Sequence, residues 1–123
     1  MKIIDTKTHG YIDYIMGIFL LAAPSLFGFD LNGKESMVLY VAGIAVIVYS
    51  LLTDYEVSFF KLIPMQFHLM LDILSGILVA ASPWILGFSD RVYGHHVAIG
   101  VIEIAAALMT RTVPERTRIE IKD

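Results

Sequence analysis

Two histidines and three acids lie inside apolar stretches of this sequence, where charged side chains are energetically unfavourable. Asp13 follows His9 by four residues, Asp72 follows His68 by four residues, and Glu103 interrupts a further apolar stretch. None of these stretches contains a Lys or Arg. In a membrane, an unpaired charge at such positions raises the free energy by about a few kcal/mol or more. These acids must therefore be protonated, hydrogen-bonded, hydrated or bound to a cation.

Three kinds of chemistry fit this pattern. In the first, each Asp pairs with its His at the i, i+4 spacing, Glu103 is protonated and bonded to a neighbouring helix, and the cluster fixes how helices dock. In the second, the acids form a proton or cation site of a small carrier or channel subunit. In the third, His9 and His68 are metal or haem ligands, with the aspartates as further ligands or as their supports.

The sequence leaves these three alternatives open, with the structural one preferred. It offers no support for an enzyme, because it lacks a Ser-His-Asp order, a Gly-rich phosphate loop and a paired metal motif. No resident cofactor is predicted. The absence of Cys excludes disulfides and thiolate metal sites, and the net charge of −3 without a basic run argues against nucleic acid as a partner. His95 and His96 are expected in solvent, and Tyr49 is expected to be a packing or interface residue.

The two His–Asp pairs belong to an internal repeat. Positions 9–29 and 68–88 align without a gap and share eight residues, namely His9/His68, Asp13/Asp72, Gly17/Gly76, Ile18/Ile77, Ala22/Ala81, Pro24/Pro83, Gly28/Gly87 and Phe29/Phe88. On a helix, the repeated His, Asp, Gly and Pro fall within about 80° of one another. We expect this face to be turned to the other repeat, with Gly allowing close backbone approach. Pro24 and Pro83 should bend their helices, and Gly28 and Gly87 should be C-terminal caps.

Four predominantly apolar stretches must position these residues, over 8–29, 36–53, 68–88 and 93–110, with Thr8 as the expected first cap. Hydrophobic residues make up 57% of the chain and charged residues 17%, against about 45–50% and about 25% in soluble domains. A helix needs about 20 residues to cross a bilayer. The sequence therefore predicts an all-α protein with a single transmembrane domain (1–123). Its four transmembrane helices form two tandem helical hairpins, given by internal repeats 9–53 and 68–110.

Lys and Arg are distributed unevenly between the two ends of these helices. The N-terminal residues, the middle connection and the tail hold seven of them, whereas the two outer turns hold only Lys34 and Arg91. The positive-inside rule then predicts cytoplasmic N- and C-termini, with 111–123 as a cytoplasmic tail. Two hairpins that run in the same direction should be related by a pseudo-twofold axis along the membrane normal.

The tripeptide Ser82-Pro83-Trp84 stands at the end of the third apolar stretch. With this tripeptide inside a duplicated two-helix unit, the chain resembles the SPW-repeat family of small prokaryotic integral membrane proteins over residues 9–53 and 68–110. The first copy departs from the motif, because Ala23-Pro24-Ser25 keeps only the proline. The resemblance implies membrane hairpins but no activity or cofactor.

The sequence therefore predicts a structural or interaction module in the cytoplasmic membrane of a prokaryote. Its expected partners are the lipid bilayer and either further copies of the chain or another membrane protein. Packing roles are predicted for Gly17, Pro24, Gly28, Gly76, Ser82, Pro83, Trp84 and Gly87.

Overall fold

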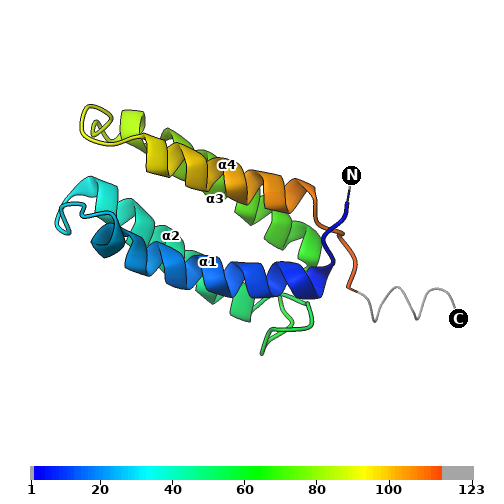
Figure 1. Ribbon diagram of the computed structural model, residues 1–123. Helices are drawn as coiled ribbons and strands as arrows, with labels where there is room; N and C mark the ends of the chain where they lie inside the picture. Colours follow the sequence, from blue (N-terminus) through cyan, green and yellow to red (C-terminus); the bar gives the residue numbers. More distant parts are fainter. Residues whose placement is uncertain (1, 115–123) are drawn as a thin grey trace, which may run out of the picture.

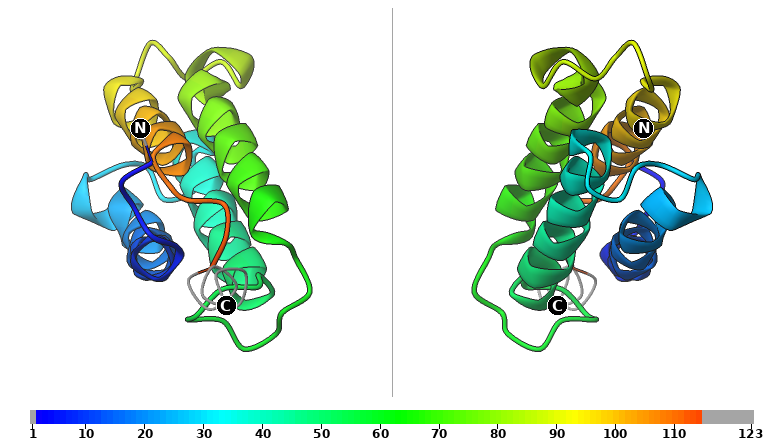
Figure 2. Two further views of the ribbon diagram at one scale, coloured as in Figure 1. Left: turned by 90° about the vertical axis from the view of Figure 1, so that its right-hand side faces the viewer. Right: turned by 90° about the vertical axis from the view of Figure 1, so that its left-hand side faces the viewer.

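A computed structural model describes residues 2–114 of the chain. Within this range the chain forms four helices, α1 (Thr6–Leu26), α2 (Lys34–Leu51), α3 (Met65–Ile85) and α4 (Gly94–Leu108). Helices α1 and α2 form one antiparallel hairpin, α3 and α4 form a second, and α2 lies beside α3 (Figures 1 and 2). The predicted all-α fold and the two tandem hairpins are confirmed. Of the predicted tail, residues 115–123 lie outside the described residues.

The turns within the two hairpins lie at one end of the bundle (Figure 1). The N-terminus and the α2–α3 connection lie at the other end. The first residues of α1 and α3 are therefore at the same end, which brings equivalent positions of the two repeats to the same level of the bundle.

Helix α1 begins at Thr6 because Asp5 caps it. The Asp5 carboxylate accepts a hydrogen bond of 2.7 Å from the backbone N–H of Thr8, and this bond holds the pKa of Asp5 below its ordinary value. The expected cap at Thr8 is therefore wrong. The carboxylate supplies an acceptor for an N–H group that has no partner within the helix.

Helices α1 and α3 both end in a glycine cap. Gly28 and Gly87 have positive φ angles of 69° and 78°. The N–H of Phe29 then donates to the carbonyl of Pro24 at 2.9 Å, as the N–H of Phe88 does to that of Pro83 at 2.8 Å. This is the Schellman arrangement. The predicted caps are confirmed, and they end the helices three residues before the expected boundaries at 29 and 88.

The Ser-Pro-Trp tripeptide lies in the last turn of α3. Pro83 has no N–H, so the carbonyl of Val79 loses its usual helical donor. The hydroxyl of Ser82 donates to this carbonyl at 2.7 Å. Trp84 is exposed on the outside of the bundle, with its ring 5.8 Å from that of Tyr93. The first repeat has Ala at the position of Ser82 and cannot form this side-chain bond.

The repeated glycines bring helices together within each hairpin. A Cβ atom on Gly43 of α2 would lie 2.9 Å from the carbonyl oxygen of Gly17. A Cβ on Gly100 of α4 would lie only 2.3 Å from the carbonyl oxygen of Gly76. The predicted role in helix packing is confirmed, but the prediction that Gly17 and Gly76 face the other repeat is wrong.

Large apolar side chains cover the outside of all four helices. At least half exposed are Ile15, Ile18, Met37, Val41, Ile44, Phe67, Met70, Leu74, Leu78, Val101 and Ile102. Most of the buried polar side chains, in contrast, gather inside one end of the bundle. Helices α2 and α3 are each long and apolar enough to cross a membrane. This distribution suggests a membrane location.

Candidate functional site

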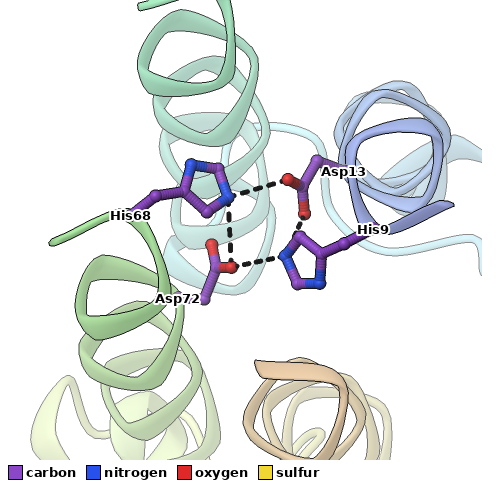
Figure 3. Close-up of side chains that lie close together, drawn as sticks. All are labelled: His9, Asp13, His68 and Asp72. Atoms are coloured by element: carbon purple, nitrogen blue, oxygen red, sulfur yellow. Dashed lines mark hydrogen bonds and ion pairs between the residues drawn. The ribbon is translucent and has the colours of Figure 1, made fainter. Parts of the chain in front are cut away.

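Four of the predicted site residues meet between the two repeats. His9 and Asp13 extend from α1 and His68 and Asp72 from α3, and all four side chains point toward a common centre (Figure 3). All four are buried, with at most 5% of each residue exposed. We call this group the His–Asp quartet.

Each imidazole of the quartet faces one carboxylate from each repeat. Nε2 of His9 lies 3.1 Å from Oδ1 of Asp13 and 2.8 Å from Oδ2 of Asp72. Nε2 of His68 lies 3.2 Å from Oδ2 of Asp72 and 2.8 Å from Oδ2 of Asp13. The predicted i, i+4 pairs therefore exist. The shorter contact of each histidine, however, is the one that crosses to the other repeat.

A threonine holds the other ring nitrogen of each histidine. Nδ1 of His9 lies 2.7 Å from Oγ1 of Thr110, and Nδ1 of His68 lies 2.7 Å from Oγ1 of Thr53. Each threonine hydroxyl donates its only hydrogen to the backbone carbonyl four residues earlier, at 2.6 Å. The threonine oxygen must then accept from the ring, so Nδ1 carries the proton and Nε2 is directed at the carboxylates.

The two threonines occupy equivalent places in the repeats. The segment that enters α1 pairs with the chain after α4 through Ile4 and Thr110, and the segment that enters α3 pairs with the chain after α2 through Ile63 and Thr53. Neither threonine was predicted from the sequence as part of the site. A signal was present, because each is the last residue of an expected apolar stretch.

Two tyrosines bind the carboxylates of the quartet from outside. The hydroxyl of Tyr49 donates to Oδ1 of Asp72 at 2.5 Å, and that of Tyr55 donates to Oδ2 of Asp13 at 3.2 Å. Burial raises the pKa of Tyr55, which lies in the α2–α3 connection, so its hydroxyl remains a donor. Tyr49, expected to be a packing or interface residue, is thus also part of the site.

Glu103 of α4 lies beside the quartet without belonging to it. Its side chain lines a cavity of about 20 Å³ together with His9, Asp13 and Asp72, which is room for about one water molecule. A cavity of this size leaves no space for a porphyrin between the two imidazoles, whose ring centroids are 5.5 Å apart.

The end of the bundle that carries the two hairpin turns holds the remaining histidines. His96 is fully buried against Phe29 and Phe88, and its Nε2 lies 2.9 Å from the carbonyl oxygen of Glu35. The expectation that His96 lies in solvent is wrong, because its ring packs against Phe29 and Phe88, which follow the ends of α1 and α3. His95 is exposed, with its ring 4.3 Å from that of Phe27.

Comparison with protein families matches the SPW repeat domain over residues 7–110 of the chain. The chain belongs to the SPW repeat family. The matched region includes both hairpins of this SPW repeat protein and the whole His–Asp quartet. No curated protein and no solved structure matches the chain.

The quartet of this SPW repeat protein can be electrically neutral in two ways. Two imidazolium groups balance two carboxylates, and one divalent cation balances the same carboxylates beside two neutral imidazoles. Burial of an unbalanced charge is strongly unfavourable. The geometry therefore supports a polar connection between the repeats and a site for a cation.

Proposed function

We propose that this SPW repeat protein is a structural and interaction module of the cytoplasmic membrane of a prokaryote, with four membrane-spanning helices and cytoplasmic termini. The observation that carries this proposal is the distribution of side chains, which is the reverse of that in a soluble protein. Apolar residues project from all four helices, while the quartet lies inside. Lipid tails are suitable surroundings for such a surface, and further copies of the chain or another membrane protein can pack against it.

All four helices, rather than α2 and α3 alone, are proposed to cross the bilayer. Helix α1 has 21 residues, and its only charged side chain beyond the first turn is the buried Asp13. Helix α4 has 15 residues, about 22 Å at 1.5 Å per residue. A helix shorter than the hydrocarbon layer is accommodated by local thinning of the bilayer.

The His–Asp quartet is proposed to lock the two hairpins together. Few other directional contacts hold a membrane bundle, because lipid is as apolar as the helix surfaces. Side chains that must meet within hydrogen-bonding distance across α1 and α3 fix the relative height and rotation of the hairpins. Such a lock would give the module one defined outer surface.

Labelling of single cysteines tests the membrane arrangement, and the natural chain contributes no background because it has no Cys. We would place one Cys at a time at Asn32, Asp90, Ser58 and, as a lipid-facing control, Ile18. A membrane-impermeant maleimide should label Asn32→Cys and Asp90→Cys from outside the cell, Ser58→Cys only after permeabilisation, and Ile18→Cys in neither case. Labelling of Ile18→Cys in intact membranes would contradict the proposal, as would the reverse sidedness of the other three.

A proton- or cation-linked carrier or channel subunit is the second candidate, favoured by the small cavity between Glu103 and the quartet. An acid that faces a bundle interior beside a water site is what such a path requires. Proteoliposomes with an internal pH dye distinguish the two functions. The structural module predicts no proton flux that depends on Glu103. A flux lost in Glu103→Gln and retained in a Glu56→Gln control would favour the carrier.

A further inference from the structure

We propose that the His–Asp quartet binds one divalent transition-metal ion, with zinc as the best fit. The ligands would be Nε2 of His9, Nε2 of His68 and one carboxylate oxygen each from Asp13 and Asp72. This inference goes beyond the structural module, since the hairpins can dock in the membrane with or without an ion. It adds a specific ligand to the contact between the repeats.

The imidazole–carboxylate spacings of the quartet are close to those of a tetrahedral site. One ligand atom from each of the four residues can be chosen so that all lie within 4.8 Å of one another. The imidazole–carboxylate spacings are 2.8–3.2 Å. A tetrahedral zinc ion with bonds of about 2.0–2.1 Å needs donor atoms about 3.3–3.4 Å apart. The imidazole–carboxylate pairs must therefore open by a few tenths of an ångström to admit the ion, and any donor pair near the 4.8 Å limit must close by about 1.4 Å.

The donor set selects a class of metal. Two imidazole nitrogens and two carboxylate oxygens suit zinc and related first-row divalent ions, whereas calcium and magnesium prefer oxygen donors alone and copper(I) prefers sulfur. Four protein ligands fill the tetrahedron completely. Such a closed site is characteristic of structural rather than catalytic zinc.

The hydrogen bonds around the quartet orient its four side chains as metal ligands. Thr53 and Thr110 accept hydrogen bonds from the Nδ1–H groups of the two histidines. Both Nε2 lone pairs are therefore directed inward, toward the centre of the quartet. Tyr49 and Tyr55 donate to the carboxylates and hold their orientation. Partners of this kind fix the tautomer and position of metal ligands.

Charge balance allows the exchange of two protons for one ion. With both imidazoles protonated, the quartet has no net charge. When a divalent ion binds, the two Nε2 protons leave to solvent and the net charge is again zero. The adjoining cavity of about 20 Å³ beside Glu103 has room for about one water molecule next to the ligands.

Cobalt(II) is the probe for this site, because its visible absorption reports tetrahedral coordination. The full chain would be purified in mild detergent through a tag without histidine, treated with chelator, and titrated with Co²⁺. We expect one Co²⁺ per chain with intense tetrahedral bands, and stoichiometric displacement by Zn²⁺. A folded wild-type protein that binds neither ion stoichiometrically would overturn the proposal. If the single-cysteine variants described above kept the expected sidedness, the membrane module would stand.

Substitutions locate the ion. His68→Gln should abolish the tetrahedral bands, while the exposed His95→Gln control should keep them. Because His68→Gln also removes two contacts of the quartet, Thr110→Val provides a milder test. It keeps every ligand and should weaken binding about 10- to 100-fold. Equal loss of Co²⁺ in His95→Gln, or unchanged affinity in Thr110→Val, would contradict the assignment.

Discussion

At the scale of single residues, the structure places Asp72 and Glu103 in different surroundings, although the sequence predicts both to be buried acids. Asp72 faces two imidazoles and accepts a bond from Tyr49. Glu103 lies at the wall of a small cavity and outside the quartet. Sequence position alone predicts a buried acid in both cases. Only the three-dimensional packing shows that Asp72 contacts side chains of both repeats.

This difference predicts that two matched substitutions have different effects on the free energy of unfolding. Asp72→Asn leaves two buried histidines with half of their compensating charge, and should lower the free energy of unfolding by about 3–5 kcal/mol. Glu103→Gln keeps the shape and hydrogen-bonding capacity of the side chain without a charge, and should leave stability unchanged or raise it. Unfolding in mixed detergent micelles, followed by circular dichroism, measures both. Equal destabilisation would show that Glu103 belongs to the same network.

The serine of the Ser-Pro-Trp motif gives a second prediction at this scale. Ser82→Ala should leave the carbonyl of Val79 without its side-chain donor and lower stability by about 1 kcal/mol. Ser25 takes the place of Trp84 in the first repeat and is exposed, so Ser25→Ala is the control and should change nothing measurable. If both variants unfold like the wild type, the proposed role of Ser82 is incorrect.

At the scale of helices, the sequence predicted the number and pairing of the elements but not all of their contacts. The repeated His and Gly are separated by about 80° around the helix. That angle is almost a quarter turn, so one helix presents the two residues to different neighbours. His9 faces the other repeat, whereas Gly17 faces α2. Angular position on one helix does not identify the partner helix, which is why the glycine prediction failed.

The close crossing of α3 and α4 predicts that alanine substitutions at two glycines of α4 differ strongly in their effect on stability. A Cβ on Gly100 would overlap the backbone of Gly76, whereas a Cβ on Gly94 meets nothing within 4 Å. Gly100→Ala should separate the helices and destabilise the protein by about 1–3 kcal/mol. Gly94→Ala should be neutral or slightly stabilising, because Ala favours helix. Similar unfolding curves for the two variants would rule out close contact at this crossing.

At the scale of the whole molecule, the two repeats build one site from equivalent parts. The repeated spacing of His and Asp was sufficient to predict two facing imidazoles with carboxylates beside them. The bonds from Thr53 and Thr110 were not predicted, because they depend on how the ends of α2 and α4 meet the segments that enter α3 and α1. The tyrosine donors both come from the first repeat and the connection after it, so the symmetry of the sequence does not reveal them.

The quartet is proposed to lock one repeat to the other. A double-mutant cycle between His9 and Asp72, whose side chains lie 2.8 Å apart, tests it most directly. Unfolding free energies would be measured in chelator for the wild type, His9→Gln, Asp72→Asn and the double variant. We predict that the double variant loses less stability than the sum of the single losses, with a coupling energy of about 0.5–3 kcal/mol. Additive losses, within about 0.3–0.5 kcal/mol, would contradict the account.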